Sequence, residues 1–406
     1  MNNRIRYLLI SVSSILVFYI VIGGLFGRAD TLNEKAYRDL GVYQEVLDRI
    51  KIDYVTDPDL KKVTDGAIRG LLEALDPYST YFTPSEYREY VQHPQSGPAD
   101  VGMFVSKRGG FATVVSVLPG SPAEKAGIKP GDLLDRIENE SARDLSVVQI
   151  QRMLAGPAGS TLAMTVVKEA RGEPQKVSIA RGTLTYPAVV AKLTDDQAAY
   201  LRLATFHKGS ATEVSAKLKE LTEKGADKVV LDLRNCAGGD VQEAVNTASL
   251  FLDKGLVAYL LGQRFPRKDL PVENSGEVNK LPLAVLINQS TAGPAELVAA
   301  AVLQNKRGEL VGTRSFGMGV YQQLIPVEDG SALLLSVAKY YGPDGKAIQD
   351  NGVAPSVVQS ESADTANLDE DTEPTGPEHF GEKGDQQFQK AIEILKTKSI
   401  ATAKAA

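Results

Sequence analysis

Apolar strands alternate with helices over residues 184–356, and this alternation limits the fold more than any other feature of the chain. Lys228–Leu233 (KVVLDL) and Leu281–Ile287 are nearly continuous apolar runs, which is typical of strands covered on both faces of a sheet. A helix is expected after each run, over Asp240–Leu252 and Pro294–Gln304. Strands and helices in this order predict an α/β core with a largely parallel sheet.

Residues 96–183 have the pattern of a small β-rich domain inserted before this core. Phe111–Leu118 is rich in β-branched residues and is predicted to be a strand. Ser121 and Pro122 open a short helix, because Ser is a favourable N-cap and Pro suits the first helical position. With the turn at Lys129–Asp132, this order of elements resembles a PDZ domain.

A PDZ domain adds the C-terminal strand of a peptide to an open sheet edge and holds its carboxylate on backbone N–H groups. The resemblance places the carboxylate-binding loop at Val101, Gly102, Met103 and Phe104. These residues are therefore the expected peptide-binding site, with unstructured protein C-termini as ligands. The alternative is that the domain packs against the core and its groove stays empty.

The N-terminus carries a run of 20 uncharged residues, Tyr7–Phe26, preceded by Arg4 and Arg6. A helix of this length spans the roughly 30 Å hydrocarbon core of a bilayer. Residues 1–29 are therefore expected to be a cytoplasmic stub and transmembrane signal-anchor. Positive charges before the run place the rest of the chain in the periplasm or otherwise outside the cytoplasm. A cleaved signal peptide is the alternative.

The remaining segments are simpler. Residues 30–95 are expected to be helical, because apolar residues recur there at spacings of three and four. Residues 357–385 hold nine Asp/Glu and one Lys, and this composition predicts a disordered linker. An amphipathic helix and a tail are expected over residues 386–406. No basic surface stands out, so a nucleic-acid partner is not expected.

Three clusters in the α/β core follow the order and spacing of C-terminal processing, or tail-specific, serine peptidases. They are Asp232–Gly239 (DLRNCAGG), Ile287–Glu296 (INQSTAGPAE) and Gly312–Gln322 (GTRSFGMGVYQ), with Leu75–Tyr81 and Tyr340–Gln349 in addition. The chain resembles that peptidase family over roughly residues 35–400. The resemblance implies a PDZ-containing peptidase fold that acts on protein C-termini without a cofactor. It also makes a bacterial inner membrane the expected location of the predicted anchor.

In that family a Lys base activates a Ser nucleophile, and a Gln orients the Lys. The nucleophile stands three residues before the Glu that begins a helix, and this position is Gly293 here. The base belongs to a Phe-Gly-Lys-Gly run, and in this chain Met318 stands in the place of the lysine. The resemblance places the orienting Gln at Gln322 and the oxyanion-hole glycines at Gly238 and Gly239.

The reactive pair is therefore absent from flanking motifs that are otherwise intact. Glycine has no side chain to attack a carbonyl, and a thioether cannot replace the base that a Ser hydroxyl needs. The sequence predicts a pseudoprotease that binds peptides with little or no proteolysis. Two alternatives stay open, namely an active endopeptidase that processes protein C-termini through another nucleophile, and a regulatory subunit of an active homologue. The sequence also leaves open whether the chain forms a homo-oligomer.

Other reactive side chains have structural interpretations. The hydroxyls near the site are interpreted as turn and capping groups, and they belong to Ser290, Thr291 and Ser315. The single cysteine, Cys236, has no His beside it in the sequence and is interpreted as a buried apolar residue. The three histidines lack the spacing of metal ligands, so no metal site is predicted at His93, His207 or His379.

Overall fold

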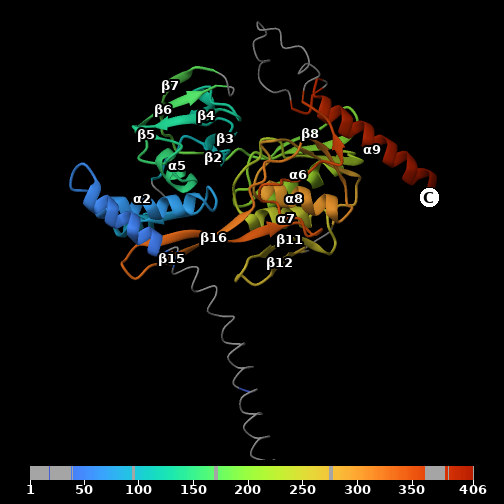
Figure 1. Ribbon diagram of the computed structural model, residues 1–406. Helices are drawn as coiled ribbons and strands as arrows, with labels where there is room; N and C mark the ends of the chain where they lie inside the picture. Colours follow the sequence, from blue (N-terminus) through green and yellow to red (C-terminus); the bar gives the residue numbers. More distant parts are fainter. Residues whose placement is uncertain are drawn as a thin grey trace, which may run out of the picture. The chain divides into compact units, whose positions relative to one another are not determined.

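The computed structural model describes residues 40–93, 97–168, 172–273, 278–361, 380–382 and 384–405, together with Phe18 and Arg38 (Figure 1). Over 398–405 it describes the backbone alone. The predicted transmembrane segment apart from Phe18, residues 362–379 and 383 of the predicted acidic linker, and with them His379, lie outside these ranges. Within the described ranges, no helix is both long enough and apolar enough to cross a bilayer.

The chain divides into two compact units, Met1–Gly70 and Leu71–Ala406. In the first unit, residues 40–53 are helical and α2 (Leu60–Glu73) begins.

In the second unit, the end of α2 is followed by a strand inside the region that the sequence predicts to be helical. β1 (Thr80–Phe82) precedes α3 (Pro84–Gln92) and pairs with a strand near the end of the core. The Asp76 carboxylate accepts from the N–H groups of Tyr78 and Ser79, at 2.8 and 2.7 Å, and this turn redirects the chain after α2. Because the next residues are β-branched or aromatic, they suit a buried strand better than a helix.

A β-rich domain follows, in which neighbouring strands are antiparallel and lie in the order β2-β3-β4-β6-β7, with β5 paired to β4. Its strands and helices are β2 (Met103–Arg108), β3 (Phe111–Val117), α4 (Pro122–Lys125), β4 (Leu133–Ile137), β5 (Glu140–Ser141), α5 (Val147–Leu154), β6 (Thr161–Val167) and β7 (Pro174–Ala180). Ser121 and Ser146 cap the two helices by accepting from the third helical N–H group. β2 is an edge strand, and α5 packs beside it.

The α/β core contains a sheet with the order β17-β14-β13-β10-β9-β8. Its strands are β8 (Val190–Leu193), β9 (Ala198–Arg202), β10 (Lys228–Asp232), β13 (Leu283–Ile287), β14 (Glu309–Gly312) and β17 (Val357–Val358). All neighbours are parallel except β8 and β9. The expectation of a largely parallel sheet is confirmed for this part of the core.

Helices cover both faces of this sheet, which explains its continuous apolar strands. Leu231 and Val285 pack toward one face with α6 (Ser210–Glu223), α7 (Val241–Ser249) and α8 (Pro294–Gln304). Val230 and Ala284 pack toward the other face with α9 (Gln386–Ala405). Figure 1 shows α6, α7 and α8 grouped together and α9 apart from them.

A second sheet is antiparallel, and here the expectation of a largely parallel core is wrong. Its strands are β1, β11 (Leu256–Leu261), β12 (Lys268–Pro271), β15 (Val320–Pro326) and β16 (Ala332–Tyr341), with the order β1-β16-β11-β12 and β15 paired to β16. A tight turn at Val327–Ser331 joins β15 to β16, and such a hairpin makes its strands antiparallel. β1 reaches this sheet from before the β-rich domain, so its pairing has no local signal in the sequence.

Candidate functional site

Gly293 lies at the turn between β13 and α8, at the expected nucleophile position. Its φ of 63° and ψ of −122° lie where a residue with a side chain is strained. In α/β-hydrolases a strained strand-to-helix turn of this kind exposes the nucleophile, so the backbone geometry suits that role. In this chain the turn presents no side chain, and Pro294 begins the helix directly after it.

Met318 faces Gly293 from the loop between β14 and β15. A Cβ atom placed on Gly293 would lie 3.1 Å from Cε of Met318, so the two positions are in contact, as a nucleophile and its base must be. The Met318 side chain packs on an apolar cluster formed by Val115, Ala237, Ala292 and Phe316, together with Phe104. Apolar packing therefore occupies the place where the resemblance leads us to expect the catalytic pair.

Glu296 connects the two loops. Its fully buried carboxylate accepts from the N–H groups of Gly293 at 2.9 Å, Gly317 at 2.7 Å and Met318 at 2.8 Å. The Ser315 hydroxyl donates to it at 2.5 Å. Burial raises the pKa of Glu296 to about 7, although these hydrogen bonds act in the opposite direction. The sequence motifs do not predict this role of Glu296, and the available signal was a carboxylate in the first turn of an otherwise apolar helix.

We expect Glu296 to make the protein less stable as the pH rises from about 4.5 to about 7. Because its pKa is raised in the folded state, the folded protein holds a proton in this window that the unfolded chain has lost. The free energy of unfolding should therefore fall with increasing pH by about 3 kcal/mol in total and level off above the folded pKa.

Denaturant unfolding at several pH values between about 4 and 8 measures how the free energy of unfolding changes with pH. Glu296→Gln should remove most of this slope, whereas Glu223→Gln, at an exposed carboxylate of α6, should leave it in place. A Glu296→Gln variant with the original slope would contradict the assignment to Glu296.

Gly238 and Gly239 lie in the loop between β10 and α7. The Ala292 N–H donates to the Cys236 carbonyl at 3.0 Å, which ties this loop to the Gly293 turn. Phe104 of the β-rich domain packs on Gly238, where a Cβ atom would lie 2.1 Å from Cε1 of the ring. The expected oxyanion-hole glycines are therefore beside the Gly293 turn, with an aromatic ring from β2 against the first of them.

A buried ion-pair network fixes the start of the loop that carries Gly238 and Gly239. The Arg234 guanidinium, 2% exposed, donates to Asp232 at 2.5 Å and to Asp385 at 2.6 Å. The Tyr200 hydroxyl donates to Asp232 at 2.7 Å, and burial raises its pKa. Asp385 immediately precedes α9, so the C-terminal segment contributes to the support of this loop, and sequence reasoning missed that contribution.

Gln322, the expected orienting residue, lies on β15. Its side-chain amide donates to the Tyr78 carbonyl at 2.8 Å, which fixes the segment before β1 against β15. The Tyr78 hydroxyl is 2.9 Å from the hydroxyl of Ser106 on β2, and burial raises the pKa of Tyr78. The motif around Tyr78 therefore joins the core to the β-rich domain beside the site, a role that the sequence does not predict.

The expected peptide-binding residues do not share one surface. Val101 and Met103 belong to the apolar core of the β-rich domain, and Gly102 is buried between them. Phe104 turns the other way and packs on Gly238. The first three residues shape the loop through their backbone, while Phe104 contacts the α/β core.

The other candidate nucleophiles have structural partners. The Thr291 hydroxyl donates to the Leu233 carbonyl at 2.8 Å, and the Ser315 hydroxyl accepts from the N–H of Val353 at 2.6 Å. Ser290 lies in the turn capped by Asn288, which accepts from its N–H at 3.1 Å. Cys236 is fully buried, and burial raises the pKa of its thiol. None of these positions takes the place of Gly293 opposite Met318.

The two described histidines lie in loops. His93 ends α3, and the ring of His207 stacks on Tyr186 with centroids 5.4 Å apart.

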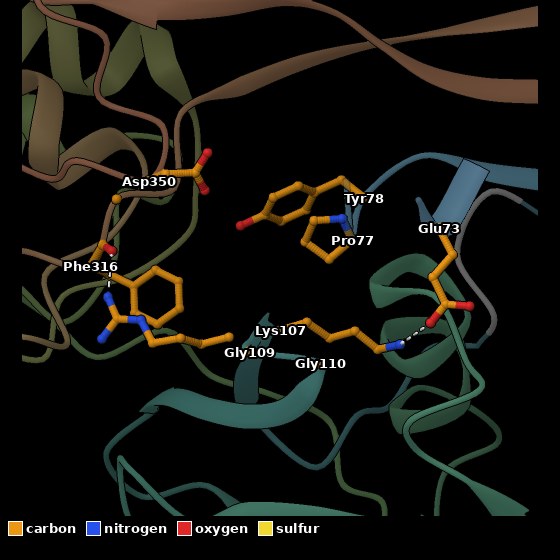
Figure 2. A pocket seen from close by; sticks show the side chains of 10 residues that line it. Glu73, Pro77, Tyr78, Lys107, Gly109, Gly110, Phe316 and Asp350 are labelled. Carbon is orange, nitrogen blue, oxygen red and sulfur yellow. Dashed lines mark hydrogen bonds and ion pairs between the residues drawn. The ribbon is translucent and has the colours of Figure 1, made fainter. Parts of the chain in front are cut away.

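A pocket of about 390 Å³ adjoins the loop that carries Met318 (Figure 2). Phe316 and Asp350 line it from the core, Tyr78 lines it from the segment before β1, and Lys107 and Arg108 line it from β2. Arg108 donates to the Phe316 carbonyl at 2.8 Å, with its guanidinium carbon 4.7 Å from the centre of that ring.

Lys107 instead points toward Glu73, with 3.8 Å between the charged atoms, and burial lowers its pKa (Figure 2). The β2–β3 hairpin is thus hydrogen-bonded directly to the loop that carries Met318, the expected base position. Lys107, which neighbours Arg108 on β2, points away from that loop.

Comparison with known proteins agrees with this geometry. The model of Peptidase family S41 matches residues 197–359, and that of the PDZ domain matches residues 113–168. The chain is 32% identical over 326 residues to the carboxy-terminal processing protease CtpA of Bacillus subtilis, covering 79% of this chain and 69% of the relative. It is 31% identical over 341 residues to the carboxy-terminal-processing protease of Bartonella bacilliformis, covering 81% of this chain and 77% of the relative.

A solved structure shares the architecture as well. The photosystem II D1 C-terminal processing protease superposes with a TM-score of 0.66 at 25% identity, covering 78% of this chain and 92% of that one. The resemblance found in the sequence motifs is confirmed, and so is the PDZ domain. The chain therefore belongs to peptidase family S41, among relatives named carboxy-terminal processing proteases.

Proposed function

We propose that this S41 family member binds protein C-termini with little or no proteolysis. The contact between Gly293 and Met318 carries the proposal, because a nucleophile and a base would have to meet at that point. Neither residue can perform its part of the reaction. In subtilisin, another serine peptidase, loss of the nucleophile or of the base alone lowers kcat by about 10⁶.

Among the residues that the structure describes, the hydroxyls and the thiol near Gly293 offer no replacement pair. The Ser315 hydroxyl is hydrogen-bonded to the Glu296 carboxylate and to the N–H of Val353, so it already fixes the loop that carries Met318. The raised pKa of Cys236 opposes formation of a thiolate, which is the nucleophilic form of cysteine. A nucleophile displaced by only ~1 Å loses about a hundredfold in rate, so hydroxyls elsewhere in the turn do not compensate.

The proposal includes a location. The uncharged run Tyr7–Phe26, with Arg4 and Arg6 before it, supports a single membrane anchor with the PDZ and peptidase-like domains outside the cytoplasm. Extraction of bacterial membranes with alkaline carbonate should leave the full chain in the membrane pellet. Release into the supernatant would contradict the anchor.

Peptide binding without cleavage is the direct test. The full chain is titrated into a fluorescent peptide that ends in small apolar residues, and fluorescence anisotropy follows binding. Mass spectrometry of the same samples after prolonged incubation reports the integrity of the peptide. We expect saturable binding and an unchanged peptide mass.

Two results would contradict the proposal in different ways. Fragments above the level of a protein-free control would favour the active endopeptidase. Absence of binding to the peptide would remove the proposed binding function.

A further inference from the structure

A carboxylate of this chain already occupies the loop expected to hold a peptide's terminal carboxylate. Oδ1 of Asp100 accepts from the N–H of Gly102 at 2.7 Å, and the N–H of Val101 also favours the ionised form of Asp100. Both N–H groups belong to the loop that the PDZ resemblance assigns to the ligand carboxylate. The internal side chain thus makes the type of contact that the end of a peptide makes in a backbone loop.

The backbone of Asp100 is fixed on both sides. Its N–H donates to the Gly182 carbonyl at 3.0 Å, and its own carbonyl accepts from the N–H of Gly182 at 3.1 Å. This bridge joins the beginning of the domain to its end. The side chain therefore starts from a position that does not change independently of the domain.

The loop itself has little freedom to move away. Gly102 has a φ of 82°, and a Cβ atom placed on it would lie 2.4 Å from Cβ of Ser121 and 3.1 Å from Cδ2 of Leu184. Only glycine fits this conformation and this close packing. The direction of the Gly102 N–H is consequently set by the fold, and one acceptor at a time is expected to face it.

The rest of the groove has the features that strand addition needs. β2 is an edge strand, and α5 packs beside it. The side chains of β2 that face the core are already engaged, with Phe104 on Gly238 and Arg108 on the Phe316 carbonyl. An added strand uses the backbone edge and does not compete for those contacts.

We propose that Asp100 is an internal competitor for the terminal carboxylate, so that a free C-terminus binds this PDZ domain only by displacing it. The inference rests on the proposed peptide-binding function and identifies the residue that sets its affinity for free carboxylates. Two ionised carboxylates on the same N–H groups repel each other, so both cannot hold the loop.

The charges around Asp100 agree with this role. Burial raises its pKa above the ordinary range, although the Gly102 and Val101 N–H groups and the charge of Arg181 act in the opposite direction. The Asp100 carboxylate is thus only partly compensated where it lies. Binding of a peptide's terminal carboxylate therefore also requires the Asp100 side chain to leave the loop.

The test compares two peptides of identical sequence, one with a free C-terminal carboxylate and one with a C-terminal amide. Both are titrated against the full chain and its Asp100→Ala, Asp100→Asn and Asp135→Asn variants. Asp135 is an exposed carboxylate on β4, so its substitution makes the same charge change in the same domain, away from the loop.

We expect Asp100→Ala to raise the affinity for the free-acid peptide by about tenfold or more, the scale of a lost competing bond to a charged group. The affinity for the amide peptide should change little. Asp100→Asn keeps an oxygen acceptor for Gly102 without the charge and should give an intermediate increase. Asp135→Asn should match the unaltered chain.

The outcomes separate this inference from the function on which it rests. Unchanged or weaker binding of the free-acid peptide by Asp100→Ala overturns the role of Asp100 and leaves the binding function intact. If no variant binds either peptide, the binding function fails, and this inference fails with it. If Asp100→Ala has lost the circular dichroism spectrum of the unaltered chain, Asp100→Asn decides, because it preserves the turn.

Discussion

The double variant Gly293→Ser/Met318→Lys is expected to cleave unfolded proteins near their C-termini, while the unaltered chain leaves them intact. The strained turn at Gly293 has the geometry that exposes a nucleophile, and a Cβ atom placed on Gly293 would lie 3.1 Å from Cε of Met318. Glu296 fixes both loops through their backbone N–H groups, so this support does not depend on the two side chains. By comparison with subtilisin, the gain in kcat should be on the order of 10⁶ if the rest of the site is competent.

Single variants serve as controls for this experiment. Gly293→Ser alone places a hydroxyl against the thioether of Met318 without a base, and Met318→Lys alone provides a base without a nucleophile. Both should stay at the level of a protein-free control when fragments are measured by mass spectrometry. Cleavage by the unaltered chain would contradict the pseudoprotease proposal.

If the double variant shows no cleavage, Phe104 is the next residue to test. Its ring packs on Gly238, an expected oxyanion-hole position. Adding Phe104→Ala to the double variant opens that contact. Cleavage that appears only in the triple variant would show that Phe104 blocks the double variant. Absence of cleavage in the triple variant would show that the rest of the cleft does not support catalysis.

Arg234→Met is expected to lower the free energy of unfolding by about 3–5 kcal/mol. The substitution leaves the Asp232 carboxylate, 0% exposed, without its principal cation and breaks the contact to Asp385. Removing one partner of a buried ion pair is costly because the other charge stays buried and uncompensated. Urea denaturation followed by far-ultraviolet circular dichroism measures the loss.

An exposed pair of the same residue types provides the control. Arg267 and Asp269 have the same sequence separation as Asp232 and Arg234, with side chains 52% and 53% exposed. Arg267→Met should therefore change stability little, since water and salt screen such a pair. Equal losses in the two variants would contradict the importance of burial for the Arg234 network.

The sequence was sufficient where a signal is local. The apolar runs of β10 and β13 predicted a parallel sheet with both faces covered, and the structure contains it. The spacing between two motifs placed Gly293 and Met318 at the expected nucleophile and base positions, and the folded chain brings these positions into contact.

Contacts between distant segments left no such signal. Asp385 lies 151 positions from its partner Arg234, and β1 pairs with β16 across most of the chain. The convergence of four donors on Glu296 depends on the closure of two loops, which periodicity does not report. The contact of Phe104 with Gly238 depends on the packing of two domains and could not be read from either domain's pattern.

The position of α9 has a consequence for synthesis. The strands of the parallel sheet are complete at Val358, but residues such as Phe388 and Ile392, which pack on one of its faces, leave the ribosome later. Until then the nascent core presents an apolar surface on Val230 and Leu286 that its own chain cannot yet cover. Such a surface is a binding site for chaperones and a risk for aggregation. Completion of this core is therefore delayed until α9 emerges, and a chain cut short before α9 should be retained by chaperones or degraded.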